Sequence, residues 1–275
     1  MKKLSNAEIV EFQKIILSWY KKNARGFPWR KTSDPYKIMV SEIMLQQTQT
    51  SRVVEKYKEW IKTFPTIETL ASAPFSTVLE KWQGLGYNRR AKFFFESAKI
   101  IVEKYDGIIP RDVLKLQSLK GIGAYTARAI AAFAFSSPEV FIETNIRSLF
   151  IFFFFKNRKT KIDDKEIFPL IEQTLYKKNI RTWYYALMDY GAALKTKVKN
   201  PSLKSAHYTK QSSFRGSLRE ARGAVLRYLS ENKKANAKKI ADSENIDYEK
   251  IEKSLCALQK EKFVAEKNGE YFIRN

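Results

Sequence analysis

The chain has 275 residues, and its 51 lysines and arginines against 29 acidic residues give a formal net charge of +22, which favours a polyanionic partner. The single cysteine, Cys256, excludes an intrachain disulfide and a cysteine-bound metal cluster. The longest apolar run, Ser148–Phe155, is too short to cross a bilayer and no signal-peptide pattern opens the chain, so we expect a cytoplasmic protein.

The first hundred residues predict a series of helices. Ser5 and Glu8 have the spacing of a capping box, and the apolar residues after them predict a helix to about Tyr20. An irregular loop, Lys21–Asp34, precedes a helix that begins at Pro35, a residue permitted in a first turn. Further helices are expected at Ser51–Phe64, Pro74–Gln83 and Arg89–Lys104, and the turn Gly84-Leu85-Gly86-Tyr87 joins the last two.

The stretch from Leu116 to Ala132 reads as two helices around a Gly121-Ile122-Gly123 turn. Glycines at Gly121 and Gly123 allow a tight turn and let backbone N–H groups approach a ligand closely. Such a helix-hairpin-helix binds a DNA phosphate through backbone amides at a helix N-terminus. An ordinary turn between two helices is the structural alternative.

Beyond the hairpin, helices are expected near Asn145–Phe155, Asp164–Lys178 and Arg181–Leu194, and no strand is predicted before Gly216. The net charge gathers here, because Lys177–Arg219 holds ten basic residues and one acid, Asp189. The only histidine, His207, lies in a polar loop, where a solvated or phosphate-contacting role is more plausible than catalysis.

The segment 216–275 differs in composition and predicts a small α+β domain. Helices are expected at Leu218–Leu229, Ala237–Ser243 and Tyr248–Gln259, with Cys256 on the apolar face of the third, in the core. Asn268-Gly269 between two short apolar runs indicates a β-hairpin, so the order of elements is that of a winged helix. Its thirteen basic and ten acidic residues from Ser217 onward leave DNA binding and a stabilising or partner-binding role equally open.

Two carboxylates in this basic chain lie beside apolar residues. Glu42 falls within Ile38–Leu45, and Glu143 follows the apolar residues Val140–Ile142. Burial raises a carboxyl pKa, which suits proton delivery near neutral pH. The alternatives are that each caps a helix or pairs with a neighbouring arginine such as Arg147.

Several segments together resemble the adenine DNA glycosylase (MutY-like) branch of the helix-hairpin-helix (HhH-GPD) superfamily: Phe27–Arg30, Asp34–Gln49, Gly84–Tyr87, Leu119–Ala127 and Phe141–Arg147. The resemblance covers roughly residues 5–215. It implies an all-α, two-lobed core at 1–215, followed by the winged-helix-like α+β segment 216–275. A six-helix barrel would occupy about 27–135 and a second lobe 1–26 plus 136–215, with DNA across the cleft between them.

The resemblance also implies roles for individual residues. Glu42 matches the acid that protonates the departing base, and Glu143 matches the carboxylate that stabilises or traps the oxocarbenium-like sugar. Tyr125 stands where lyase relatives carry a nucleophilic lysine, which implies a monofunctional glycosylase. The base pocket would include Trp29, Arg30, Leu45, Tyr185 and Asp189. DNA-binding residues would include Gln47 and Tyr87, which wedge into the base stack, with Gln49, Gly121, Gly123, Lys195 and Lys204.

The chain departs from the family pattern at several positions. The carboxylate at Glu143 is usually aspartate, and Tyr185 replaces a glutamine that reads adenine. The iron–sulfur cysteines would fall at four positions where none is present: Lys195, Ser202, Ser205 and Gln211. We therefore expect no cofactor and no metal. The segment 216–275 replaces the domain that recognises 8-oxoguanine.

The resemblance therefore implies a base-excision-repair glycosylase that hydrolyses the N-glycosidic bond of a mispaired base, with adenine opposite guanine or 8-oxoguanine favoured. One alternative substrate is thymine or uracil opposite guanine. Another possibility is a non-catalytic DNA-binding module, although two retained acids facing phosphate would not help a binder. The expected partner is double-stranded DNA with a mispaired or damaged base, bound by a nucleoid-associated monomer.

Overall fold

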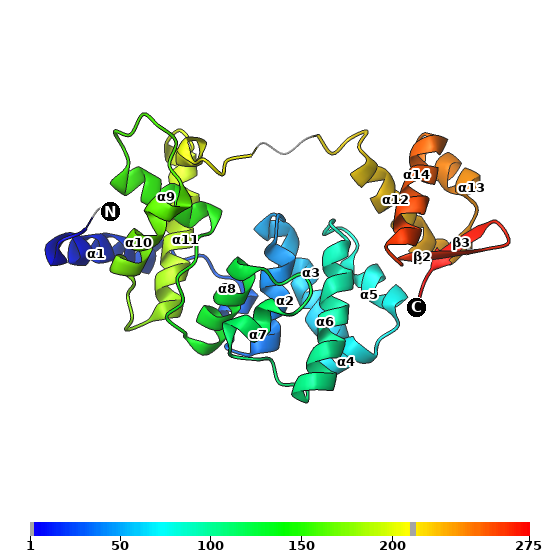
Figure 1. Ribbon diagram of the computed structural model, residues 1–275, viewed down its shortest axis with the longest axis horizontal. Coiled ribbons are helices and arrows are strands. Elements are labelled where there is room, and N and C mark those ends of the chain that lie inside the picture. Colours follow the sequence, from blue (N-terminus) through cyan, green and yellow to red (C-terminus); the bar gives the residue numbers. More distant parts are fainter. Residues whose placement is uncertain (1–2, 210–212) are drawn as a thin grey trace. The chain divides into compact units, whose positions relative to one another are not determined.

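The computed structural model describes residues 3–209 and 213–275 (Figure 1). The described residues form an all-α core and a small antiparallel sheet near the C-terminus, which confirms the predicted fold class. The chain divides into two compact units. The first contains residues 3–42, 110–118 and 122–209, and the second contains residues 43–109, 119–121 and 213–275.

The first unit is built from helices whose apolar faces meet in one core. Phe12, Ile38, Phe133, Phe150 and Trp183 are among its buried members. Its elements are α1 (Asn6–Asn23), η1 (Pro28–Lys31), α2 (Pro35–Leu45, up to Glu42), α7 (Val113–Gln117), α8 (Ala124–Phe135), α9 (Thr144–Phe154), α10 (Asp164–Thr174), α11 (Ile180–Lys197) and η2 (Pro201–Lys204).

The second unit contains the end of α2, four helices from the middle of the chain and the whole C-terminal segment. Trp60 packs edge-on against Trp82, with 5.5 Å between ring centroids, and stacks on Phe94 at 5.8 Å. The middle helices are α3 (Thr50–Thr63), α4 (Ile67–Ser72), α5 (Phe75–Trp82) and α6 (Arg89–Tyr105).

The C-terminal segment has the winged-helix order of elements, and we call residues 213–275 the C-terminal module. Its strands are ordered β1-β3-β2, all antiparallel, with Val264 opposite Ile273 and Lys267 opposite Glu270 at the hairpin. The hairpin turn uses Asn268 at φ 55°, as the Asn-Gly pair predicts. The elements are α12 (Leu218–Asn232), β1 (Lys234–Ala235), α13 (Ala237–Glu244), α14 (Tyr248–Lys260), β2 (Val264–Lys267) and β3 (Glu270–Ile273).

Some local expectations were wrong. The capping box of Ser5 and Glu8 is present, but α1 continues to Asn23, and the expected loop also contains η1. Helix α4 and strand β1 were not predicted, because six and two residues are too short for a periodic signal. Cys256 is exposed rather than in the core, since Leu255 and Leu258 take the buried face of α14.

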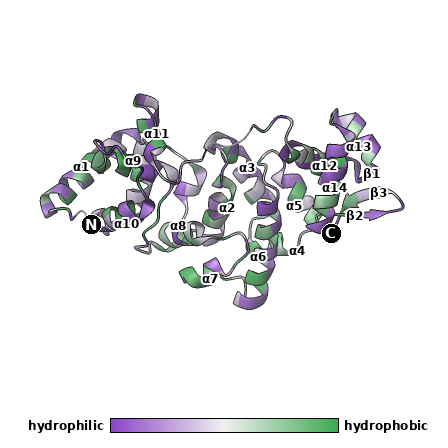
Figure 2. Cartoon of the chain, turned by 45° about the horizontal axis from the view of Figure 1, so that its top comes forward, coloured by the Kyte–Doolittle hydropathy of each residue, from purple (hydrophilic) through white to green (hydrophobic). Residues whose placement is uncertain are grey.

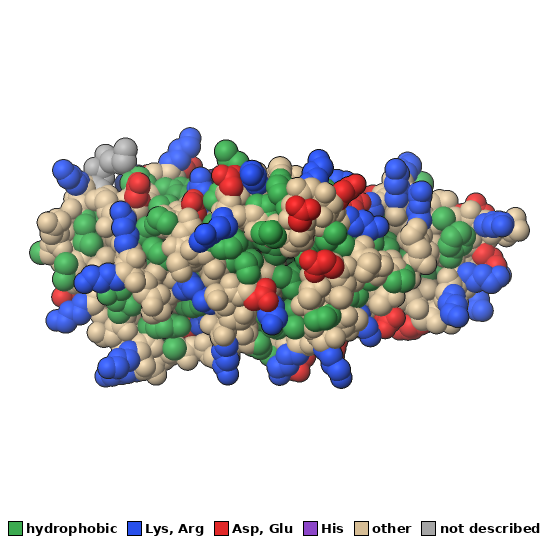
Figure 3. Space-filling view, turned by 90° about the horizontal axis from the view of Figure 1, so that it is seen from below, with side chains coloured by type: hydrophobic (Ala, Val, Ile, Leu, Met, Phe, Trp, Pro, Cys, Tyr) green, Lys and Arg blue, Asp and Glu red, His purple; other side chains and the backbone are tan. Residues whose placement is uncertain are grey.

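Hydrophobic and hydrophilic residues both occur along the helices of the two units, as expected for amphipathic helices (Figure 2). Lys and Arg side chains are spread over the face drawn in Figure 3, with fewer acids between them. Among the described residues, no helix combines the length and the apolar character needed to cross a membrane.

Candidate active site

Glu42 lies on α2 and is almost fully buried, with 6% of its surface exposed. Helix α2 starts at Pro35, where Asp34 Oδ1 accepts hydrogen bonds from the backbone N–H groups of Tyr36 and Lys37. The Tyr125 hydroxyl donates to Glu42 Oε2 across 3.4 Å. Burial raises the pKa of Glu42 to about 7; the Tyr125 hydrogen bond opposes the rise and the negative charge of Glu143 adds to it. Glu42 therefore holds a proton in much of the population at neutral pH.

Tyr125 is carried by the first turn of α8, directly after the glycine hairpin. Its ring packs edge-on against Phe141, with 5.7 Å between centroids. Burial first, and then the charges of Glu42 and Glu143, raise the pKa of the Tyr125 hydroxyl well above its usual value. Tyr125 is therefore a neutral hydrogen-bond donor to Glu42.

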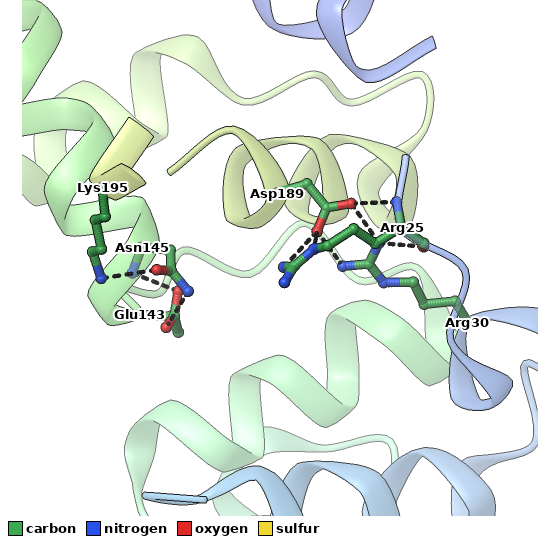
Figure 4. A network of polar contacts seen from close by, with 6 residues as sticks. All are labelled: Arg25, Arg30, Glu143, Asn145, Asp189 and Lys195. Carbon is green, nitrogen blue, oxygen red and sulfur yellow. Dashed lines mark hydrogen bonds and ion pairs between the residues drawn. The ribbon is translucent and has the colours of Figure 1, made fainter. Parts of the chain in front are cut away.

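Glu143 caps the N-terminus of α9 and is partly buried. Its Oε2 accepts from the backbone N–H of Asn145 at 2.7 Å, and its Oε1 accepts from Asn145 Nδ2 at 3.0 Å. Lys195 Nζ in turn donates to Asn145 Oδ1 at 2.8 Å (Figure 4). Burial raises the pKa of Glu143, while the Asn145 N–H and the Lys195 charge hold it down. The capping alternative is thus correct, and the Arg147 alternative is wrong because Arg147 forms its salt bridge with Asp164.

Gly191 explains how Lys195 reaches Asn145, although the sequence alone did not single it out. The two residues are one helical turn apart on α11, and a Cβ at Gly191 would lie 2.1 Å from the backbone oxygen of Asn145. Only glycine permits this contact between α11 and α9. Asn145 was also missed, although an acid-Thr-Asn sequence at a helix start is a capping signal.

Asp189 and Arg30, both predicted for the base pocket, form a buried ion pair. Arg30 Nη1 and Nη2 donate to the two carboxylate oxygens of Asp189 at 2.8 Å each. Arg25 adds its backbone N–H at 2.9 Å and its Nε at 2.7 Å (Figure 4). Burial would raise the pKa of Asp189, but the bonds and charges of both arginines outweigh it and the pKa is lowered. Asp189 therefore remains an anion, unlike Glu42.

Aromatic rings enclose the Arg30 guanidinium. Its Cζ lies 4.9 Å from the ring centroid of Phe27 and 4.5 Å from that of Tyr185. Trp29 is buried and stacks on Phe27, and Tyr185 stacks on Phe133 at 4.6 Å. Tyr185 is therefore fixed by packing on both faces of its ring.

The other residues predicted for the base pocket or as wedges, Leu45, Gln47 and Tyr87, belong to the second unit. Leu45 is partly buried at the end of α2, while Gln47 and Gln49 are exposed in the turn that follows. Tyr87 ends the Gly84–Tyr87 turn and is 38% exposed. Gln47 and Tyr87 both have left-handed backbones, at φ 53° and 50°. Such a conformation is uncommon for residues with a Cβ and is found where the surrounding structure fixes it.

Arg90, which the sequence did not single out, connects these two turns. Its buried guanidinium donates to Ile43 O and Met44 O in the last turn of α2 and to Gln46 O just after it, at 2.6–2.9 Å. It also donates to Leu85 O and Gly86 O at 3.1 and 3.0 Å, in the glycine turn. Burial lowers the pKa of Arg90 to about 10, which still leaves it cationic at neutral pH.

The hairpin glycines have different local surroundings. Gly121 has φ 76°, and a Cβ there would lie 2.9 Å from the Cβ of Phe93, so the turn needs glycine. Gly123 is the N-cap of α8, with open space around it and no side-chain cap. Because Gly123 has no side chain to cap α8, it leaves the first backbone N–H groups of this helix available, as anion binding at a helix N-terminus requires.

The residues at the expected iron–sulfur positions do not fit a cluster, which needs thiolates. Ser202 is buried, and its Oγ lies 2.5 Å from Ser148 Oγ. Ser205 Oγ accepts a hydrogen bond from the backbone N–H of His207, and Lys195 donates one to Asn145. Gln211 lies outside the described residues. Nearby, Lys204 Nζ donates to the backbone oxygen of Lys156 at 2.7 Å.

Residues 40–175 match the family described as HhH-GPD superfamily base excision DNA repair protein. An adenine DNA glycosylase of Buchnera aphidicola subsp. Baizongia pistaciae is 37% identical over 184 residues, or 66% of this chain and 52% of that protein. One of Mycolicibacterium smegmatis is 47% identical over 133 residues, or 48% of this chain and 45% of that protein. The chain thus spans about half the length of these curated relatives.

A solved structure of a thermostable thymine-DNA glycosylase has a TM-score of 0.64 and is 26% identical, covering 73% of this chain and 94% of that one. An endonuclease III–DNA covalent intermediate has a TM-score of 0.59 at 16% identity, covers 70% of this chain and 88% of that one, and supports the fold alone. On this evidence residues 40–175 match the HhH-GPD superfamily of base excision DNA repair proteins, and the chain is similar to adenine DNA glycosylases.

Proposed function

We propose that the protein is a DNA glycosylase that hydrolyses the N-glycosidic bond of adenine mispaired with guanine or 8-oxoguanine. The observation that carries the proposal is Glu42: a buried carboxyl with a pKa of about 7, hydrogen-bonded by Tyr125 and close enough to Glu143 to be affected by its charge. Glu42 lies within residues 40–175, which match the HhH-GPD family, and adenine DNA glycosylases are among the relatives of this chain.

The chemistry follows from the two charge states. Protonated Glu42 donates its proton to a ring nitrogen of adenine as the bond between C1′ and the base breaks, so the base leaves neutral. Anionic Glu143 stabilises the positive charge that develops on the sugar. Water then adds its oxygen to C1′ and releases a proton, which restores the acid. Arg30 and Asp189, which form a buried ion pair, would line the base pocket, and the lowered pKa of Asp189 keeps this carboxylate anionic.

The same site supports glycosylase activity without lyase activity. Tyr125 offers a hydroxyl where a Schiff base would need an amine. Lys120 on the hairpin is the nearby lysine to consider, and it forms a salt bridge with Glu96 at 2.8 Å. Borohydride trapping of an enzyme–DNA adduct at the rate of base release would contradict this part of the proposal.

The proposed partner is double-stranded DNA with a mispaired base, bound by a monomer. The +22 charge, the uncapped start of α8 and the basic stretch after α11 support it. Each lost phosphate contact should lower the salt slope of binding by roughly one. Substituting Lys197 and Lys199, which lie in that exposed stretch, should lower the slope, whereas Lys3→Ala at the distant chain start serves as the matched control.

We also propose that activity needs no iron or other metal. Hydroxyl and amine groups at Lys195, Ser202 and Ser205 are not iron–sulfur ligands, and the serines already bond protein atoms. Metal analysis of purified, active protein checks this, and stoichiometric iron would refute it.

Single-turnover cleavage of four duplexes tests the substrate: adenine opposite guanine, adenine opposite 8-oxoguanine, thymine opposite guanine and uracil opposite guanine. We expect adenine release at similar rates from the first two. Faster release of thymine or uracil would favour the second candidate, which the 26% identical thymine-DNA glycosylase structure supports. No release from any duplex would favour a binding module.

A further inference from the structure

The C-terminal module is not a separate appendage but packs within the second unit. Phe263, just before β2, lies 5.9 Å from Phe75 of α5, whose other neighbour is Phe95 of α6 at 5.4 Å. The side chain of Asn275 accepts from the backbone N–H of Ser76 at 3.0 Å. Apolar packing and a polar contact therefore fix the module against α5 and α6.

Glu261 adds an ionic connection between the module and α6. Its carboxylate accepts two hydrogen bonds from the Arg89 guanidinium at 2.6 and 2.9 Å. It accepts two more from the guanidinium of Arg222 on α12 at 2.7 and 3.0 Å. The hydrogen bonds from Arg89 are the largest influence, and with those from Arg222 they outweigh burial and lower the pKa of Glu261 to about 2. This carboxylate is therefore ionised at every physiological pH and holds α12 beside the start of α6.

The first turn of α12 then reaches the wedge residue. Arg219 Nη1 donates to the Tyr87 hydroxyl at 3.1 Å, and Arg219 Nη2 donates to the backbone oxygen of Ser213 at 3.2 Å. The Cζ atom of the buried Arg90 lies over the Tyr87 ring, 5.6 Å from its centroid. Tyr87 thus contacts one guanidinium of the core through its ring and one of the C-terminal module through its hydroxyl.

We propose that Arg219 is a positioning residue for Tyr87, and that through it the C-terminal module takes part in opening the base stack. The proposal rests on the proposed function, because it needs Tyr87 to enter DNA. Tyr87 has a left-handed backbone at φ 50°, a conformation that is uncommon for a residue with a Cβ and persists where the surrounding structure fixes it. Fixing its hydroxyl in the free protein reduces the freedom that it must lose on insertion.

A double-mutant cycle tests this inference with Arg219→Ala and Tyr87→Phe, the second of which keeps the ring and removes the hydroxyl. Two readouts are compared: single-turnover release of adenine opposite guanine, and fluorescence of 2-aminopurine placed next to the mismatch. One hydrogen bond contributes about 1 kcal/mol, so each single variant should slow both processes about fivefold. The double variant should be no slower than either, because both changes remove the same contact.

The outcomes separate the alternatives. If the rate losses of the two single variants multiply in the double variant, and Arg219→Ala also lowers the salt slope of DNA binding, Arg219 contacts a phosphate and the proposal is overturned. An Arg219→Ala variant with wild-type rates would overturn it as well. If the wild-type protein releases no base yet the fluorescence cycle is non-additive, the proposed function fails and the positioning role stands.

Arg227→Ala is the matched control. Arg227 lies on the same helix and is exposed, but it pairs with Glu244 inside the module. Its removal should leave both readouts unchanged, and thermal unfolding confirms that each variant is folded. Glu261→Gln, which weakens the attachment of α12, should give a smaller loss of the same kind as Arg219→Ala.

Discussion

Two buried carboxylates of the first unit, Glu42 and Asp189, have pKa values that are shifted in opposite directions. Asp189 receives hydrogen bonds from two arginines at 2.7–2.9 Å and its pKa is lowered, whereas Glu42 accepts from the Tyr125 hydroxyl at 3.4 Å and has a pKa of about 7. Burial is common to both, so the partners decide which one holds a proton. Asp189 therefore stays in an ion pair with two arginines, whereas Glu42 can take up or release a proton near neutral pH.

The largest expected effect is on catalysis. Glu42→Gln keeps the size and the Tyr125 contact but cannot donate a proton, so the single-turnover rate should fall about 10²–10⁴-fold. The affinity for mismatched DNA should change little. A rate within a few-fold of wild type would show that Glu42 is not the acid.

Asp189→Asn should instead lower stability. The substitution removes the negative charge that offsets the burial of the Arg30 guanidinium. Removing one partner of a buried ion pair lowers the free energy of unfolding by about 3 kcal/mol or more. Because Arg25 is 39% exposed, we expect the lower end of that range. Urea unfolding measures the change. Exposed Glu55→Gln, which breaks a surface pair with Lys58, is the control and should change stability by less than about 1 kcal/mol.

The two carboxylates should also give stability opposite dependences on pH. The folded-state pKa of Glu42 is raised from 4.5 to about 7, so its contribution is full below pH 4.5 and is lost as pH rises through 7. Glu42→Gln should therefore gain stability relative to wild type over that interval, by up to about 3 kcal/mol. Asp189, with its lowered pKa, contributes above its unfolded value and loses that contribution as pH falls through its folded value. Equal urea midpoints for Glu42→Gln and wild type at pH 5 and pH 8 would contradict the assignment.

The rate of base release should follow the proton on Glu42. Above pH 7 the rate should fall, approaching tenfold per pH unit, because the acid is then ionised. On the acid side it should fall as Glu143, whose pKa is also raised, becomes protonated. A single-turnover profile from pH 5 to 9 checks both limbs, and Glu143→Asp should keep measurable activity because it retains an anion.

Tyr125→Phe should have the smallest effect. The hydroxyl lowers the pKa of Glu42 by favouring its ionised form, so the phenylalanine variant should move the alkaline limb to higher pH by a fraction of a unit. The same profile measured on this variant tests the sign, and a shift to lower pH would mean that Tyr125 stabilises the protonated acid instead.

Much of the architecture could be predicted from local sequence. The capping residues Ser5 and Glu143, the glycines of the hairpin turns and the Asn268-Gly269 pair each have a conformational preference that acts within a few residues. The helices were therefore found with ends displaced by a few residues, whereas the short α4 and β1 were missed. Cys256 was wrongly placed in the core because residue spacing predicts the apolar face of a helix but not which residues at the border of that face are buried by neighbouring elements.

The sequence by itself determined the fold class, the candidate acids and the basic character of the chain, since these depend on residue type and short spacing. Only the tertiary structure decided that Gly191 brings Lys195 to Asn145, that Arg90 joins two turns and that Arg219 meets Tyr87. It also decided the protonation states of Glu42 and Asp189. These features depend on groups far apart in the chain, because burial and charge act through space and the partners are set by packing.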